Sequence, residues 1–335
     1  TGAGGGVDEA GRPPDGLSGI ASWDLPRVVA EIRRRFAAAL DPAERLQALP
    51  VGRWEAILER GALPDTYRPT LWDVVARDAL AFAASGERGL VDAEDAFEFD
   101  VDSPALGTRA EFLAWKPEDD PRLTDTLSPL VAAARLHRRL LEFHAGDADR
   151  TALLASDLER IRWARDAAVS PGGDAERTAR TVRALEALVE DCGTSEVAAL
   201  ARHEWALAER QRDDDDAVVR ARAIAAAGAA AHPESAGGKL CRNLVAEIDG
   251  RSLEVSTETV WAEPWPVIRV RYRNLARVHV RVVKADWIGR LRAGKPQWQW
   301  LDDADRGAML SARPEREFAV DLPATTNLRD ATRDI

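Results

Sequence analysis

The spacing of apolar residues changes once along the chain, close to Gly250. Before that glycine, apolar residues recur every three or four positions, as they do on one face of an α-helix. After it they alternate with polar residues, as they do on one face of a β-strand. The pattern therefore predicts a helical region that is followed by an antiparallel β-region.

We expect three segments. Residues 1–20 are rich in glycine, proline and aspartate and contain few apolar residues, which is typical of a flexible linker. Residues 21–250 are expected to form a helical-repeat domain, and residues 251–335 a partial β-sandwich. The predicted fold class is α+β, mainly α, with a TPR-like α-solenoid before the partial antiparallel β-sandwich.

Four helix starts carry capping sequences. Asp41 precedes Pro42 and is expected to cap a short helix that the proline opens. Ser22 is expected to cap the first helix, because a serine hydroxyl accepts a hydrogen bond from the first turn. Thr70 and Asp73 have the spacing of a capping box. Ser128 precedes Pro129, and proline is favoured at the first helical position.

Residues 87–126 form the least regular part of the helical region, with four aromatic residues among many acids. A long irregular segment in a compact domain needs a structural or functional reason. We expect a strap that packs over the helices, with residues 108–115 forming a short helix that buries Phe112 and Trp115. A partner-binding loop is the alternative.

An approximate repeat with an offset of 40 residues relates residues 192–202 to residues 232–242. Ser195 corresponds to Ser235, and in each copy a helix is expected to end, turn at the serine and start again. Helix–turn–helix units of this kind stack into solenoids, because neither helix buries its apolar face alone.

Four strands are expected after Gly250, fewer than the about seven strands of a typical β-sandwich. They are residues 252–261, 267–273, 277–284 and 316–322. The second and third are expected to form a hairpin through the short turn at residues 274–276. Residues 287–313 are mostly polar and are expected to form a loop.

Charge and composition exclude some classes of partner. The chain has 335 residues, with 57 acidic residues against 46 Lys and Arg, a net charge of −11. Such a chain is a poor ligand for a phosphate backbone, so we expect no nucleic-acid partner. We expect no membrane span, because no apolar run is long enough. The chain starts at Thr1 rather than Met, so we expect a longer natural N-terminus.

The sequence contains no recognisable catalytic, cofactor-binding or metal-binding motif. His137 and His144 lie seven positions apart on one helical face, but no third ligand accompanies them. Cys192 and Cys241 belong to no metal or redox motif, and we expect both to be unpaired residues in or near the core. The glycine-rich segments do not follow strands, and no nucleophile elbow is present. We therefore expect a non-enzymatic protein without a cofactor.

Four tryptophans flank the predicted strands and form a candidate interaction surface. They are Trp261, Trp265, Trp298 and Trp300. Exposed indole rings would stack on a peptide or a sugar. We favour the alternative that they fill the seam between the β-region and the helices, because large aromatic side chains contribute most when buried.

Four stretches together resemble one large family, the bacterial alpha-2-macroglobulin-like proteins. They are Tyr67-Arg68-Pro69-Thr70-Leu71-Trp72-Asp73, Leu136-His137-Arg138-Arg139-Leu140-Leu141-Glu142-Phe143-His144, His232-Pro233-Glu234-Ser235 with Gly237-Gly238 and Cys241-Arg242-Asn243-Leu244, and Val270-Arg271-Tyr272-Arg273-Asn274. Their order and spacing resemble the N-terminal helical region of that family where it enters the first macroglobulin β-domain. The resemblance covers roughly residues 22–322.

The resemblance implies a location in the cell envelope, periplasmic or outer-membrane associated, or secretion. It also implies a long parent chain of serial β-sandwich domains, linked to protease inhibition through a cleavable bait region. Many members carry a thioester in a Cys-Gly-Glu-Gln context. Here Cys192 is followed by Gly193 and Thr194, and Cys241 by Arg242 and Asn243, so no trap residue is transferred.

The expected function is a non-enzymatic structural or recognition segment of such a parent. Its expected partners are proteins, namely the downstream domains of the same parent chain and proteases. The alternative is an independent TPR-like scaffold that binds proteins or peptides and has no connection with protease control.

Overall fold

The computed structural model describes residues 23–58, 61, 63–85, 97–120, 123, 128–258, 267–294 and 302–335. The chain divides into two compact units, Thr1–Leu244 and Val245–Ile335. Helices predominate among the described residues, and the strands form small antiparallel sheets. The predicted fold class, α+β with mainly α-helical content, is therefore confirmed.

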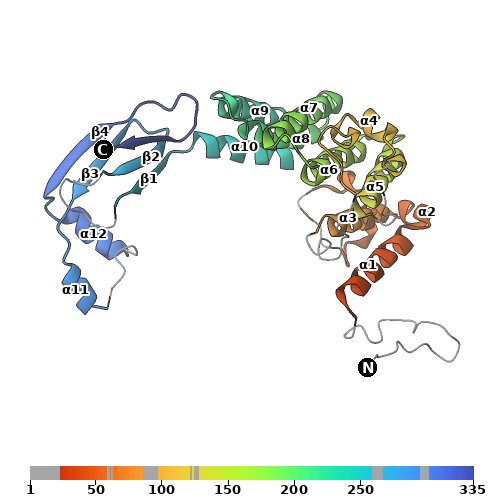
Figure 1. Ribbon diagram of the computed structural model, residues 1–335, viewed down its shortest axis with the longest axis horizontal. Helices are drawn as coiled ribbons and strands as arrows, with labels where there is room; N and C mark the ends of the chain where they lie inside the picture. The colour runs from red at the N-terminus through yellow and green to blue at the C-terminus, as the bar shows by residue number, and fades with distance from the viewer. Residues whose placement is uncertain are drawn as a thin grey trace. The chain divides into compact units, whose positions relative to one another are not determined.

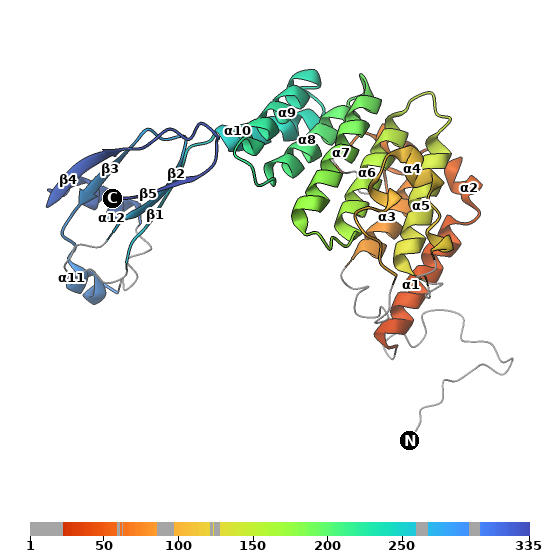
Figure 2. The same ribbon diagram turned by 45° about the horizontal axis from the view of Figure 1, so that its top comes forward.

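The first unit is built from α-helices that pack in chain order (Figure 1). They are α1 (Leu25–Leu40), α2 (Ala43–Gln47), α3 (Leu71–Ala84), α4 (Arg109–Ala114), α5 (Pro129–His144), α6 (Thr151–Ala167), α7 (Asp174–Cys192), α8 (Val197–Arg210), α9 (Ala217–Ala231) and α10 (Ala236–Asp249), which continues into the second unit. Short 3-10 helices lie at Val51–Trp54, Asp65–Tyr67, Pro104–Leu106 and Pro117–Asp119. From α5 to α9 each helix packs against the next, and α3 packs against both α1 and α5 (Figure 2).

Two of the four predicted helix caps are present. The cap predicted at Asp41 is wrong, because Pro42 occupies the N-cap position of α2 and no side chain caps that helix. The Thr70 side chain and Asp73 form a complete capping box at the start of α3, and Ser128 caps α5. The first helix differs, because it begins at Leu25 and its cap is Asp24, which accepts a hydrogen bond from the Arg27 amide at 3.0 Å. Aspartate caps a helix as well as serine does, so the cap preference alone did not separate the two positions.

Apolar side chains from neighbouring helices form the core of the first unit. Trp72 of α3 is fully buried, and its ring meets Phe143 of α5 edge-on at 5.4 Å between centroids. Leu154, Leu158 and Ile161 of α6 lie in the larger apolar cluster. Each large apolar side chain buried in this way stabilises the fold by about 1.5–3 kcal/mol.

The strap over the helices is confirmed for residues 97–120. Thr108 caps α4 through a second capping box, and Phe112 is only 1% exposed. Trp115 is partly buried and packs against both Phe99 and Phe112, with ring centroids 5.6 Å and 6.2 Å apart. Its packed aromatics make this segment part of the core rather than a free loop.

The second unit contains two antiparallel sheets (Figure 1). Its strands are β1 (Ser252–Ser256), β2 (Arg269–Arg273), β3 (Arg277–Val282), β4 (Arg316–Asp321) and β5 (Ala331–Asp334). One sheet has the order β1-β2-β5, and the other pairs β3 with β4. Val270, Tyr272, Val278 and Leu322 form the small core of this unit.

The predicted hairpin of the second and third strands is wrong. β2 pairs with β1 and β5, whereas β3 pairs with β4. Between them Asn274 adopts a left-handed φ of 55°, and its amide side chain donates to the carbonyl of Ile248 at 3.1 Å. The chain turns a corner between two sheets there, and Val270 and Val278 share one core. Alternating apolar residues suit either arrangement, so the pattern did not separate them.

Residues 287–313 are not simply a loop, because they contain α11 (Trp287–Arg292) and α12 (Asp303–Ser311). Asp286 and Asp302 cap these helices. Both are shorter than the segment needed to show a helical period, which is why the pattern missed them. The fifth strand, β5, was also missed, since only four residues form it.

Candidate functional site

The four tryptophans of the candidate interaction surface, Trp261, Trp265, Trp298 and Trp300, all lie outside the described residues. That surface stays a prediction. The linker predicted at residues 1–20 also lies outside the described residues. The remaining candidates are polar clusters and hollows of the described residues.

A buried ionic cluster joins α3 to the end of α5. Nε2 of His144 lies 2.7 Å from Oδ1 of Asp73, and its Nδ1 lies 2.7 Å from Oδ2 of Asp147. The side chains of His144 and Asp73 are fully buried. Asp73 also accepts a hydrogen bond from the Thr70 amide at 2.9 Å. One carboxylate therefore caps α3 and pairs with α5 at the same time.

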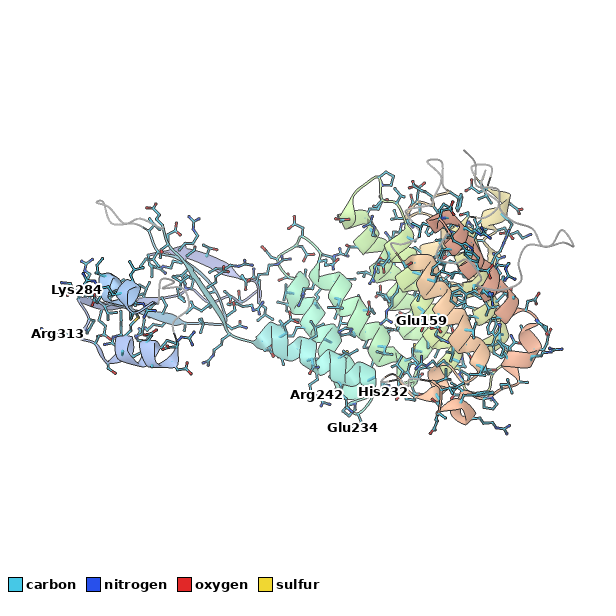
Figure 3. The ribbon with its side chains drawn as sticks, turned by 90° about the horizontal axis from the view of Figure 1, so that it is seen from below. Glu159, His232, Glu234, Arg242, Lys284 and Arg313 are labelled. Carbon is cyan, nitrogen blue, oxygen red and sulfur yellow. The ribbon has the colours of Figure 1, made fainter. Side chains whose placement is uncertain are left out.

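Arg77 extends this cluster to α6. Its Nε donates to both carboxylate oxygens of Glu159, at 2.9 Å and 2.8 Å, and its Nη1 lies 3.4 Å from Oδ1 of Asp73. Its Nη2 donates to the carbonyl of Tyr67 at 2.9 Å. Glu159 is labelled in the first unit in Figure 3. The cluster thus ties α3 to α5 and to α6, across sequence separations of 71 and 82 residues.

The cluster is held in its charged form. Burial opposes protonation of His144. The hydrogen bond and the charge of Asp73, together with those of Asp147, nevertheless raise the pKa of His144. Burial likewise opposes ionisation of Asp73, but the hydrogen bond and charge of His144, then the charge of Arg77, lower its pKa. Both shifts favour the ionised form, in which His144 is an imidazolium between two carboxylates.

This geometry does not support acid–base catalysis. A histidine that activates a nucleophile uses one ring nitrogen for its carboxylate and leaves the other free for the nucleophile. In His144 both ring nitrogens meet carboxylates. The buried cluster can join helices, but it offers no atom to a substrate.

His137, one of the two histidines singled out by spacing, has a different environment. Its ring lies 5.1 Å from that of Trp163, and neither ring nitrogen has a hydrogen-bond partner among the described residues. Burial, followed by the positive charges of Arg160 and Arg77, lowers the pKa of His137 to about 3. His137 is therefore neutral. Across the described residues, no group of three or more His, Cys, Asp or Glu side chains could hold a metal.

A second buried cluster fixes the strap to α6. Arg160 donates to Oδ1 of Asp157 from Nε at 3.0 Å and from Nη2 at 2.6 Å. Its Nη1 donates to the carbonyls of Ala105 and Gly107 at 2.9 Å and 2.7 Å. The guanidinium satisfies strap carbonyls that would otherwise be buried without a partner. This cluster is also structural.

The turn between α9 and α10 carries the third of the four stretches. The Ser235 hydroxyl accepts a hydrogen bond from the Gly238 amide at 3.0 Å, and Nη2 of Arg242 donates to the carbonyl of Pro233 at 2.6 Å. Figure 3 labels Arg242 close to His232 and Glu234 of this turn. These polar groups close the turn and cap α10.

Small residues of this stretch and of α9 allow α8, α9 and α10 to approach closely. A Cβ at Gly237 would clash with the backbone nitrogen of Leu200, and a Cβ at Gly228 would meet Sγ of Cys241. Sγ of Cys241 donates to the carbonyl of Ala199 at 3.3 Å. The stretch therefore forms a contact between helices.

Both cysteines are buried and free, as the sequence predicted. Burial, with smaller contributions from neighbouring charges, raises the pKa of Cys192 to about 12 and that of Cys241 to about 11. Both remain protonated thiols near neutral pH. Neither is a candidate nucleophile, because the thiolate is the reactive form.

The hollow with the clearest binding character is an elongated groove of about 780 Å³, here called the α1–α3–α5 groove. Large apolar side chains and alanines of three helices form its surface. They are Phe36, Leu40, Leu80, Phe82 and Leu136, with alanines at positions 30, 37, 79, 83, 132 and 133. Concave, mostly apolar hollows of about 300–1,000 Å³ are the usual ligand-binding sites of proteins.

The walls of this groove are positively charged. Arg33 and Arg34 of α1 and Arg135 and Arg139 of α5 line it, together with Asp41. Nη2 of Arg139 donates to the carbonyl at the end of α1 at 3.2 Å, and its guanidinium lies 5.5 Å from the Trp72 ring centroid. The groove is therefore apolar with guanidinium groups on two sides.

A second hollow, between α6, α7 and α8, is larger but more polar, with a volume of about 1,210 Å³. Its charges are largely matched. Oε1 of Glu204 lies 2.8 Å from Nη2 of Arg162, and Oε2 of Glu204 lies 3.1 Å from Nη1 of Arg165. Burial opposes ionisation of Glu204, but His203 and these arginines lower its pKa to about 2. The α1–α3–α5 groove remains the better candidate.

Sequence reasoning did not find the α1–α3–α5 groove. Its only sequence signals are alanines beside arginines on the predicted first helix and on the helix that begins after Ser128.

None of the helices in the described part combines the length and apolarity of a membrane span. A comparison of the chain with protein-family models finds no match, and comparisons with curated proteins and with solved structures find none either.

Proposed function

We propose that this chain is a non-enzymatic structural and recognition segment of a large bacterial alpha-2-macroglobulin-like protein. Four sequence stretches support the proposal through their resemblance to that family. The order of a helical unit and then an antiparallel β-unit agrees with the N-terminal helical region and the start of the first macroglobulin domain. The proposed location is the cell envelope or the exterior.

One observation carries the proposal. Asp73 closes the first of the four stretches and His144 closes the second, and their side chains meet at 2.7 Å in the protein interior. A buried charge without its partner is strongly destabilising, so the two residue types are required together. A resemblance that depends on such a pair reflects a shared packing arrangement better than two unrelated surface matches would.

The other polar groups of the described core agree with a structural role. Arg160 binds the carbonyls of the strap, and Ser235 and Arg242 close a turn between helices. The proposed partners are accordingly proteins, namely the downstream domains of the same parent chain and proteases. The segment contributes a rigid helical surface rather than a reacting group.

The coding sequence on either side of this chain tests the proposal. Serial β-sandwich domains downstream, and a signal sequence upstream, are the expected finding. Continuation into further helical repeats without β-domains would contradict it and would favour an independent TPR-like scaffold.

The second candidate function is that independent scaffold for proteins or peptides. The α1–α3–α5 groove favours it, because an apolar groove between helices is a common way to bind a peptide. Both candidates share a recognition role for the helical unit. They differ in the kind of domain expected downstream of that unit in the parent chain.

A further inference from the structure

We propose that the α1–α3–α5 groove binds an acidic amphipathic helix of a partner protein. The apolar face of that helix would enter the groove, and its carboxylates would meet the arginines on both walls. The inference rests on the recognition role proposed above and names the class of partner that the groove fits.

The length of the groove suits a short helix. On α1 it extends from Ala30 to Leu40, and on α5 from Pro129 to Arg139. At 1.5 Å per residue these distances are each about 15 Å, or about three helical turns. A whole helix has a diameter of about 10–12 Å and would not fit into 780 Å³. Only one face of it can therefore enter.

The surface of the groove suits large apolar side chains. Phe36 of α1 packs against Phe82 of α3, with ring centroids 5.9 Å apart, and gives the groove an aromatic side. Alanines on all three helices leave space beside these rings. A bound helix would place anchors there at positions i, i+4 and i+7 of its sequence, as amphipathic helices do in other grooves.

The distribution of charge selects a helix over a simple acyl chain. Arg33 and Arg34 lie on α1, whereas Arg135 and Arg139 lie on α5, so cations line both walls. A fatty acid carries a single carboxylate at one end and can meet only one wall. A helix with acidic residues on both flanks of its apolar face can meet both.

The net negative charge of the first unit as a whole adds to this selectivity. Residues 1–244 carry 43 acidic residues against 31 Lys and Arg. Among the described lining residues of the groove there are four arginines and one acid, Asp41. Glu31 pairs with Arg34 at 2.6 Å, so Arg135 and Arg139 of α5 carry more of the unmatched charge. An acidic helix would be repelled by most of the unit and attracted here.

A binding measurement with the full chain tests the inference. The ligand is a fluorescein-labelled peptide of about 14 residues, with leucines at helical spacing and glutamates on both flanks. A second peptide carries lysines in place of the glutamates.

Ala37→Trp fills the groove and Ala38→Trp, one position along α1, places the same side chain outside it. Arg135→Glu reverses a charge of the groove, and Arg183→Glu reverses an exposed one on α7.

The acidic peptide should bind saturably, as measured by fluorescence anisotropy. Ala37→Trp and Arg135→Glu should each weaken it by about tenfold or more, while Ala38→Trp and Arg183→Glu should leave it unchanged. The lysine peptide should bind at least about tenfold more weakly. Circular dichroism would establish that each variant keeps its fold.

Three results with the peptides and variants would overturn the inference. They are no saturable binding of the acidic peptide, equal effects of the groove variants and their controls, and equally tight binding of the lysine peptide. Binding of dodecanoate with the same dependence on the variants, in place of the peptide, would assign the groove to a small amphiphile and would also overturn it. None of these results decides the parent family, which the neighbouring coding sequence tests separately.

Discussion

At the scale of single residues, the charged groups of the helical core have definite partners. His144 lies between Asp73 and Asp147, and Arg160 lies between Asp157 and the strap. Burying an isolated charge is costly, and removing one partner of a buried pair leaves the other uncompensated. These residues therefore make sharp tests of the helical packing.

Replacing His144 by glutamine should destabilise the protein by about 3–5 kcal/mol near pH 6, because Asp73 then loses its buried cation. The pKa of His144 is raised in the folded state. Its contribution is therefore complete below the unfolded pKa of about 6.5 and is lost as the pH rises through the folded pKa. Urea denaturation followed by far-UV circular dichroism, repeated at increasing pH from about pH 6, should show this difference shrinking as His144 loses its proton.

The matched control is Asp147→Asn, because Asp147 is the more exposed of the two carboxylate partners. It should destabilise by about 1 kcal/mol or less, as partly exposed ion pairs do. A difference between wild type and His144→Gln that stayed constant across this pH range would contradict a charged His144.

Gly237→Ala should destabilise by about 1–3 kcal/mol, because the added methyl group would clash with the backbone of α8 at Leu200. Gly146→Ala is its control, since a Cβ there meets no atom within 4 Å. Thermal denaturation of both variants measures the difference. Equal stability of the two would show that α8 and α10 are not in close contact.

Local residue contacts were predictable, and distant ones were not. Thr70 and Asp73 are three positions apart, so their capping box follows from spacing alone. Asp73 and His144 are 71 positions apart. Nothing in either stretch identifies the other as its partner, because the pairing depends on how α3 and α5 pack.

At the scale of elements, periodicity predicted the helices well and strand pairing poorly. The capping sequences placed the starts of α3 and α5 where they are observed. The alternation of β2 and β3 was recognised, but they belong to different sheets. Alternation defines the apolar face of a strand, whereas the neighbouring strand depends on the path of the chain.

The groove could not be predicted from the sequence, for a related reason. Its walls come from α1, α3 and α5, which do not follow one another directly in the sequence. The individual alanines and arginines are ordinary residues of amphipathic helices. They form a groove only because these three helices pack together.

Phe112→Ala should destabilise the protein by about 3–5 kcal/mol, because Phe112 holds the strap against the core and is 1% exposed. Ile57→Ala should change stability by about 0.5 kcal/mol or less, since Ile57 is 73% exposed. Urea denaturation of the two variants provides the comparison. A small effect of Phe112→Ala would revive the interpretation of residues 87–126 as a partner-binding loop.

At the scale of the whole molecule, the β-unit presents an exposed strand. β1 lies at one edge of the β1-β2-β5 sheet in the described part of the chain, and Leu253 and Val255 are 50% and 52% exposed. Exposed apolar edge strands pair readily with other chains. The β-unit is therefore the expected site of self-association.

Analytical ultracentrifugation of the full chain should show association that increases with concentration. Val255→Lys should reduce it, because a lysine on an edge strand opposes pairing. Val219→Lys introduces the same change at an exposed position of α9 and should leave association unaltered. Equal behaviour of the two variants would remove the edge-strand explanation.

The central claim is that this chain is a scaffold segment without trapping activity of its own. Neither Cys192 nor Cys241 lies in a Cys-Gly-Glu-Gln sequence, and both thiols are buried and protonated. The chain therefore contains no thioester sequence of the kind that many members of the proposed family carry.

The most direct test mixes the chain at equimolar ratio with several proteases of different specificity and measures cleavage of a large protein substrate. The scaffold account predicts that each protease keeps its full rate on that substrate. Sustained inhibition toward the large substrate, with hydrolysis of a small peptide substrate retained, would show that the chain encloses the protease and would contradict the account.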